Sequence, residues 1–98
     1  MPKNATVTCP AGTPTQLTDT AVSAARVVGL KDFYLCATTA ATPPADLEGA
    51  VMMLPFSVLA ADLALVDLFP GVGASVYLWG WPVGSDPTET VDVSVSHV

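Results

Sequence analysis

Positive charge is scarce in this sequence. Lys3, Arg26 and Lys31 are its only cations, and with nine acidic residues they leave a formal net charge of −6. Proteins that bind nucleic acid need a basic patch against the phosphate backbone, and three separated cations cannot form one. Attraction to anionic lipid headgroups also depends on clustered Lys and Arg. We therefore expect no nucleic-acid partner and no membrane partner.

Long hydrophobic runs are also missing. The longest, residues 50–61, is about a dozen residues long and contains Pro55 and Ser57, whereas a membrane-spanning helix needs about 20 apolar residues. The first residues, Met-Pro-Lys-Asn, are not followed by the apolar region of a secretory signal. The sequence predicts neither a membrane span nor a targeting segment.

Few residues could perform chemistry. A serine or cysteine nucleophile needs an activating base, and the only histidine is His97, which we expect at a strand end facing solvent. Two cysteines and this one histidine are too few and too scattered for a zinc site. Gly71 and Gly73 lack the third glycine and the following helix of a phosphate-binding loop. We expect no enzymatic activity, no metal and no cofactor.

The acidic residues are scattered as well. Asp46 and Glu48 share one expected loop, and Asp86 and Glu89 share another. Neither loop has the dense series of oxygen ligands that calcium sites use. These acids are expected at the surface, outside any metal site.

Cys9 and Cys36 are the only cysteines. They could form a disulfide across two strands, or they could be two buried thiols that pack as small apolar side chains. Because no secretion signal is visible, the sequence favours two thiols.

The composition indicates one small domain with partners. A chain of 98 residues and 10.0 kDa is long enough for one domain, and such a chain buries roughly two thirds of its unfolded surface. Of its residues 51% are hydrophobic and only 12% are charged. A monomer rarely exposes large apolar patches, so we expect a homo-oligomer. The candidates for the core or for that interface are Val51, Met53, Phe56 and Phe69.

Alternating apolar residues predict two strands in the last quarter of the chain, at residues 76–81 and 91–98. Tyr77, Trp79 and Trp81 share one face of the first strand. In the second, Val91, Val93 and Val95 alternate with Asp92, Ser94 and Ser96. Residues 82–90 are rich in turn formers, so we expect the two strands to pair as an antiparallel hairpin.

Further β-prone segments precede this pair, at residues 5–9, 15–18, 21–30, 33–38 and 50–56. Residues 26–30 are expected to be the end of the strand at 21–30, and residues 50–56 are expected to be a buried strand. Lys31 and Asp32 are expected to form a hairpin turn. Residues 39–49 contain Pro43 and Pro44, and because proline cannot donate to a ladder, this segment is expected to be an exposed loop.

Residues 58–69 are ambiguous. Helical spacing of Leu59, Leu63, Val66 and Leu68, with Ser57 as N-cap, competes with a short strand that includes Leu63 and Leu65. A strand followed by a tight turn at residues 67–71, one helical turn at most, agrees better with the β-rich surroundings. The whole chain is then a single all-β domain, an antiparallel sandwich or flattened barrel of about seven or eight short strands.

Trp79 and Trp81 are the best candidates for function. Exposed, such a pair could stack on a sugar or dock a protein. Buried, it would belong to the core or to a subunit interface, which is the favoured interpretation. Strand alternation gives Tyr77 the same placement as the two tryptophans.

Several short motifs resemble the small proteins that decorate or cement the heads of tailed bacteriophages. They are Leu-Phe-Pro-Gly at residues 68–71, the aromatic strand at residues 77–79, Val-Ser-Val-Ser-His at residues 93–97, and a Thr/Ala-rich first half with a central Pro-rich loop. The resemblance implies a compact β fold without enzymatic activity, made in the host cytoplasm and placed on the outer capsid surface of the virion. It also implies a homotrimer at local three-fold axes that binds the major capsid protein.

On this interpretation, loops and chain ends contact the capsid. The expected contacts are an extended N-terminal arm at residues 1–10 and the loop at residues 39–49, with Pro43, Pro44, Asp46 and Glu48 as candidate interface residues beside Tyr77, Trp79 and Trp81. The alternative is a carbohydrate- or receptor-binding β module of a head fibre, tail or neck. Exposed aromatic residues would favour that alternative.

Overall fold

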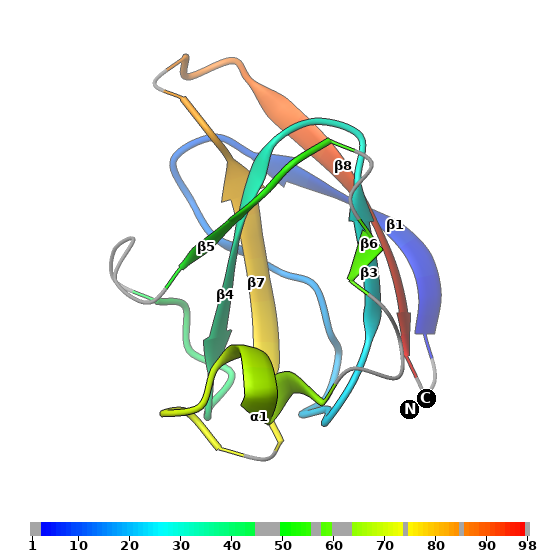
Figure 1. The fold of residues 1–98 in the computed structure, drawn as a ribbon. Coiled ribbons are helices and arrows are strands. Elements are labelled where there is room, and N and C mark those ends of the chain that lie inside the picture. Colours follow the sequence, from blue (N-terminus) through cyan, green and yellow to red (C-terminus); the bar gives the residue numbers. More distant parts are fainter. Residues whose placement is uncertain are drawn as a thin grey trace.

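Two antiparallel sheets pack face to face in the computed structural model of this protein (Figure 1), which describes residues 3–44, 50–55, 58–59, 64–73, 75–84 and 86–97. In sheet A the strand order is β1 (Lys3–Pro10), β8 (Thr90–His97), β3 (Arg26–Gly29) and β6 (Val58–Leu59). In sheet B it is β2 (Thr15–Gln16), β7 (Tyr77–Pro82), β4 (Phe33–Thr38) and β5 (Val51–Met53). The predicted all-β sandwich is confirmed.

The core between the sheets follows from strand alternation. The inward side chains of β8 are Val91, Val93 and Val95, and all three are essentially inaccessible to solvent. Phe33 and Leu35 point inward from β4 and are also fully buried. Burying a Val, Leu or Phe side chain contributes roughly 1.5–3 kcal/mol, so these two strands supply much of the stability of the sandwich.

The predicted hairpin between the last two strands is wrong. β7 pairs with β2 and β4 in sheet B, whereas β8 pairs with β1 and β3 in sheet A. The expected hairpin turn at Lys31 and Asp32 likewise joins strands of different sheets, β3 and β4. Alternation shows which side of a strand is apolar and faces the core. It does not show whether the next strand lies in the same sheet or in the sheet that packs against it.

The turn between β3 and β4 is too tight for any residue but glycine at its start. A Cβ added to Gly29 would collide with two atoms of the Phe33 ring. The ring therefore lies directly against the backbone where the chain leaves sheet A. This close contact requires the small residue and carries the chain into sheet B.

The expected N-terminal arm is also wrong for the residues that the structure describes. β1 pairs with β8 along its whole length, from Lys3 opposite His97 to Pro10 opposite Thr90. The Lys3 ammonium also lies 3.0 Å from the Asp19 carboxylate. Residues 3–10 are thus a structural strand; only Met1 and Pro2 of the expected arm lie outside the described residues.

His97 does not face solvent as expected. Its relative exposure is 7%, because it follows Val91, Val93 and Val95 on the inward side of β8. β1 covers this strand to its end, with Lys3 opposite His97. The alternation that predicted the strand also placed this side chain inside.

The ambiguous segment contains both kinds of structure. β6 lies at Val58–Leu59, and a single helical turn, α1 (Leu65–Leu68), follows after residues outside the described part. The Phe69 amide donates to the Leu65 carbonyl at 2.8 Å, and both side chains are buried. The strand predicted at Leu65 is therefore wrong, and the limit of one helical turn is confirmed. Ser57 and Leu63 lie outside the described residues.

Candidate functional site

The outer face of sheet B carries an aromatic cluster separate from the inter-sheet core. Tyr34 and Cys36 of β4 and Tyr77, Trp79 and Trp81 of β7 form it, and we call these five residues the aromatic face. The β4–β7 register sets Tyr34 opposite Trp81 and Cys36 opposite Trp79. The prediction that the three aromatic residues of residues 76–81 share one side of their strand is confirmed.

Specific contacts hold the aromatic face in place. The ring centroids of Tyr34 and Trp81 lie 5.7 Å apart with an interplanar angle of 40°, a separation typical of favourable aromatic pairs. The Trp79 indole Nε1 donates a 2.8 Å hydrogen bond to Thr38 Oγ1, and this hydroxyl donates to the Ala40 carbonyl at 2.7 Å. Trp79 is therefore tied to the segment that follows β4.

The tryptophans are buried although they lie on an outer face. The relative exposures of Trp79 and Trp81 are 4% and 8%, and Tyr77 is half-buried. Ala50, just before β5, packs against this cluster. A ligand that stacks on an indole needs one face of the ring open, and these rings are not open in the single chain.

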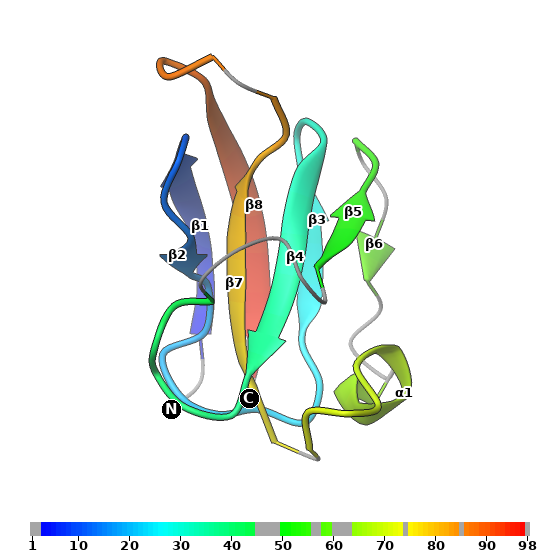
Figure 2. The ribbon, with the colours of Figure 1, turned by 90° about the vertical axis from the view of Figure 1, so that its left-hand side faces the viewer.

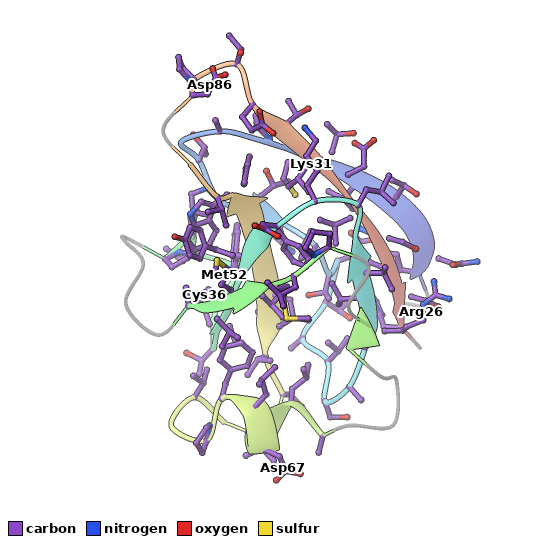
Figure 3. The ribbon with its side chains drawn as sticks, turned by 45° about the horizontal axis from the view of Figure 1, so that its top comes forward. Arg26, Lys31, Cys36, Met52, Asp67 and Asp86 are labelled. Atoms are coloured by element: carbon purple, nitrogen blue, oxygen red, sulfur yellow. The ribbon has the colours of Figure 1, made fainter. Side chains whose placement is uncertain are left out.

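The aromatic face continues into an exposed apolar edge at β5. Met52 lies opposite Tyr34 in the β4–β5 register and is 51% exposed, and Leu54 just beyond the strand is 56% exposed. The buried strand predicted at residues 50–56 is therefore an edge strand with only Val51 and Met53 packed against the core. Phe56 lies outside the described residues. Figure 3 shows Met52 and Cys36 on this side of the molecule.

The Pro-rich loop begins where β4 ends. Residues 39–43, including Pro43, are exposed, and Pro44 is half-buried, so the predicted exposed loop is confirmed for this part. Figure 2 shows this part running from the end of β4 to the side of β2. Asp46 and Glu48 lie outside the described residues.

The outer face of sheet A has a different chemistry. Its outward side chains are Asn4, Thr6 and Thr8 of β1, Asp92, Ser94 and Ser96 of β8, and Arg26 and Val28 of β3. Thr8 Oγ1 donates to Asp92 Oδ1 at 2.8 Å, and Arg26 Nη2 donates to Ser94 Oγ at 3.2 Å. We call this set the hydroxyl face.

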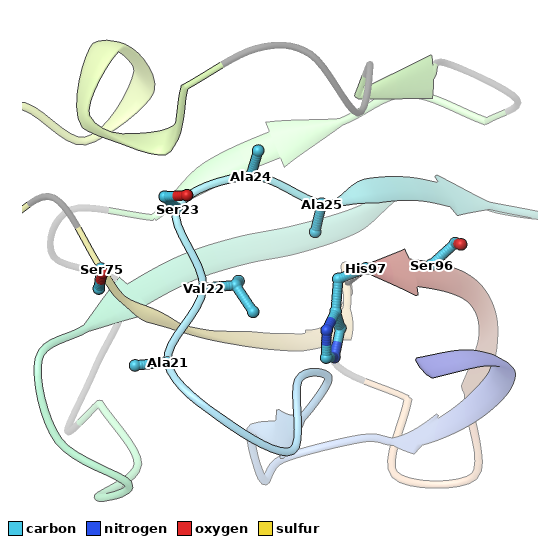
Figure 4. A pocket seen from close by; sticks show the side chains of 8 residues that line it. All are labelled: Ala21, Val22, Ser23, Ala24, Ala25, Ser75, Ser96 and His97. Carbon is cyan, nitrogen blue, oxygen red and sulfur yellow. The ribbon is translucent and has the colours of Figure 1, made fainter. Parts of the chain in front are cut away.

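A hollow of about 530 Å³ lies at the end of β8 (Figure 4). It is lined by Ala21, Val22, Ser23, Ala24, Ala25, Ser75, Ser96 and His97. His97 is the only one of these lining residues with an ionisable side chain. Nearby, the Lys3 ammonium hydrogen-bonds to the Asp19 carboxylate and lowers the pKa of this group from its ordinary value of 3.8. His97 also interacts electrostatically with the Asp19 carboxylate and contributes to lowering its pKa.

The acids of the β7–β8 connection stabilise turns. Asp86 Oδ1 accepts hydrogen bonds from the Thr88 amide at 2.9 Å and the Thr88 hydroxyl at 2.8 Å, and these bonds lower the pKa of Asp86. Glu89 pairs with Lys31 at 2.7 Å. Within the described ranges, no three or more His, Cys, Asp or Glu side chains gather where they could bind a metal ion. No helix among the same residues has the length and apolarity to cross a membrane.

The two cysteines lie in different clusters. Cys9 belongs to the core between the sheets, and Cys36 belongs to the aromatic face. Burial raises the pKa of the Cys9 thiol to about 11. The prediction of two buried thiols is confirmed.

Comparison with protein-family models, curated proteins and solved structures finds no match to this chain. The resemblance to phage head proteins therefore stays a prediction. Sequence reasoning missed the exposed edge at β5, although Pro55 was a usable signal, because proline near a strand often indicates an edge position.

Proposed function

We propose that this protein is a non-enzymatic structural protein of a phage virion that binds the outer surface of the assembled capsid and stabilises it. Its partner would be the major capsid protein, and its working form a homotrimer. The sequence motifs described above support this proposal. The structural observation that carries it is the exposed apolar edge at β5.

Among the described residues, three of the four exposed large apolar side chains lie in one part of the sandwich, and the fourth, Val66, is on α1. Leu30, Met52 and Leu54 are each more than half exposed, at 54%, 51% and 56%. Met52 and Leu54 lie at the β5 edge, and Leu30 begins the turn between β3 and β4, at the end of the sandwich where β5 finishes (Figure 1). Exposed apolar groups gathered beside a rigid sheet favour a protein–protein contact.

Capsid binding explains how so small a contact could be effective. Each copy offers only a few apolar side chains, but a multivalent arrangement multiplies weak contacts into strong total binding. A protein that binds only the assembled lattice also stabilises that lattice by mass action. Neither effect requires a chemical step.

The carbohydrate- or receptor-binding alternative depends on open aromatic rings. Trp79 and Trp81 are nearly inaccessible at 4% and 8% exposure. This burial counts against a stacking platform on the aromatic face, and we therefore retain the capsid proposal.

The test uses phage particles prepared without this protein. Purified protein is added, binding is measured by co-sedimentation, and capsid opening is followed on heating. We expect binding in hundreds of copies per particle and a higher opening temperature.

Met52→Lys should reduce binding at least ten-fold, because it places a long cation on the apolar edge. Thr6→Lys, an equally outward position on the hydroxyl face, is the matched control and should bind as wild type. Particles that open at the same temperature with and without the protein would rule the proposal out.

A further inference from the structure

We infer that a hollow at one end of the sandwich binds a segment of the partner that combines an apolar side chain with Lys or Arg. We call it the end hollow; it measures about 330 Å³ and is lined by Leu30, Lys31, Asp32, Pro55, Val83 and Glu89. The inference rests on the proposed function for the partner's identity as capsid protein. It adds the chemistry of the contact.

The end hollow has an apolar wall and rim. Leu30, Pro55 and Val83 line it, and Leu30 is 54% exposed. Phe33, the first residue of β4, pairs with Met53, the last residue of β5. Continuing this antiparallel register by one residue places Leu54 beside Asp32. Leu54 is 56% exposed. An apolar side chain inserted here would remove Leu30 from water and would lie close to Leu54, and this burial is the main source of affinity available at this end.

The charge around the end hollow is negative. Lys31 is its only cation, and it is engaged by Glu89 Oε1 at 2.7 Å and the Thr90 carbonyl at 3.1 Å. Asp32 is half-buried and forms no ion pair with any residue that the structure describes.

Two further acids lie close to the same end. The Leu30 amide donates to the Asp92 carbonyl at 3.1 Å, and the Glu89 amide donates to the Asp86 carbonyl at 3.1 Å. Figure 3 shows Lys31 and Asp86 on this side of the molecule. The lining alone, Asp32 and Glu89 with Lys31, has a charge of −1, and the Asp86 and Asp92 carboxylates, which bind Thr88 and Thr8, add negative charge near the same end.

This charge selects the occupant. Complementary charge steers association and disfavours wrong partners, so a segment bearing Lys or Arg fits Asp32, and an acidic segment does not. At this hollow the acids disfavour a second copy of this chain, whose net charge is −6, so a homotrimer would be joined through another surface. Exposed ion pairs contribute only about 0–1 kcal/mol, so the apolar insertion supplies most of the affinity and the charge supplies the selection.

The first test needs no phage particle. The ¹⁵N-labelled protein is titrated with a twelve-residue peptide of alternating Leu and Lys, and amide shifts are recorded by NMR. We expect saturable shifts at residues 30–32, Val83 and Glu89 that weaken as salt is raised. A Leu/Glu peptide should produce no such shifts, and a Ser/Lys peptide only weak ones. Shifts centred elsewhere, or equal shifts with the Leu/Glu peptide, would overturn the inference.

Matched substitutions at the two ends of the molecule refine the test. Leu30→Ser should weaken binding of the Leu/Lys peptide about ten-fold, since losing half of a leucine burial corresponds to roughly one decade in Kd. Asp32→Lys should weaken it and remove most of its salt dependence. Val66→Ser and Asp67→Lys change an exposed apolar residue and an exposed acid on α1, at the opposite end of the sandwich (Figure 1), and should have no effect.

The outcomes separate this inference from the proposed function. If particles bind the protein and Leu30→Ser binds them as wild type does, the inference fails and the proposed function stands. If the peptide binds the end hollow and particles do not bind the protein, the proposed function fails and the contact chemistry stands. Concentration-dependent self-association through residues 30–32, without peptide, would identify a second copy as the occupant and overturn the inference.

Discussion

The hydroxyl face of sheet A and the aromatic face of sheet B are both outer faces of strands that alternate in the same way. On the hydroxyl face, the central strand β8 presents Asp92, Ser94 and Ser96, and their neighbours on β1 are exposed threonines and an asparagine. On the aromatic face, the corresponding central strand β7 presents Tyr77, Trp79 and Trp81, and its two tryptophans are almost completely buried.

The difference shows that sheet B is buried on both sides at its centre. Leu78 points into the inter-sheet core with no exposed surface, and Trp79, the next residue, is 4% exposed on the other side. A residue on the hydroxyl face can exchange its protein contacts for water at little cost. A residue on the aromatic face cannot, because it belongs to a second apolar cluster.

Truncating one residue on each face should give the largest contrast. Trp79→Ala should lower the free energy of unfolding by about 3–5 kcal/mol, the usual range for removing a buried tryptophan. Ser94→Ala should change it by about 0.5 kcal/mol or less, as surface substitutions do. Urea denaturation followed by circular dichroism measures both. Equal losses for the two variants would mean that the faces do not differ in burial.

A smaller contrast is expected between two threonines. Thr38→Val removes the acceptor of the Trp79 indole and leaves a buried N–H unsatisfied, which should cost about 1–3 kcal/mol. Thr6→Val is the same change at an exposed position of the hydroxyl face, and its effect should stay within about 0.5 kcal/mol. Combining Thr38→Val with Trp79→Phe should recover part of the loss, because the unsatisfied donor is then absent. An additive double variant would contradict this account.

The interior between the two faces should respond to alkaline pH. The pKa of Cys9 is raised to about 11 from its ordinary value of 9.0. Above pH 9 the unfolded chain therefore loses this proton before the folded chain does, and stability falls as pH rises between these two values. The free energy of unfolding, measured from pH 8 to 11, should fall less steeply with pH for Cys9→Ala than for wild type. Cys36→Ala, the matched change on the aromatic face, should keep the Cys9 contribution; the same slope in all three proteins would contradict the prediction.

The smallest effect on stability is expected at acid pH, from two carboxylates that lie away from the aromatic face. Asp19 and Asp86 have pKa values lowered below the ordinary value of 3.8 by hydrogen bonds from Lys3 and from Thr88, respectively. Their stabilising effect is complete well above pH 3.8 and is lost as pH falls through the lowered values. Both carboxylates are exposed, so the loss should be slight. Urea midpoints measured from pH 6 to 2 should fall less steeply for Asp19→Asn and Asp86→Asn than for wild type.

Much of the strand content was predictable from sequence because alternation and β-branched residues act locally. The strand at residues 33–38 is predicted to the residue, and the two C-terminal strands to within one or two. Pairing was not predictable, because β7 is apolar on both sides. A strand of that kind carries no signal that says which side meets the core or which strand lies beside it.

The candidate site was predictable only in part. The shared placement of Tyr77, Trp79 and Trp81 follows from a period of two. The exposure of Leu30, Met52 and Leu54 does not follow from the sequence pattern, because these residues are as hydrophobic as core residues. They are exposed because they lie at an edge or an end of a sheet, where no further strand covers them. The end hollow gathers residues from three separate connections, so its lining depends on the crossings between sheets that local patterns do not specify.

The pairing of β1 with β8 has a consequence for how the protein is made. Lys3 and His97 are opposite each other in one ladder, so sheet A cannot be completed until β8 has left the ribosome. β4 and β5 are the one pair of consecutive strands, among those described, that hydrogen-bond to each other. Folding dominated by contacts between distant parts of a chain is slow, and until sheet A packs on sheet B the inward side chains of sheet B, such as Leu35 and Leu78, are open to water. We therefore expect newly synthesised chains to aggregate more readily at high concentration until the first and last strands meet.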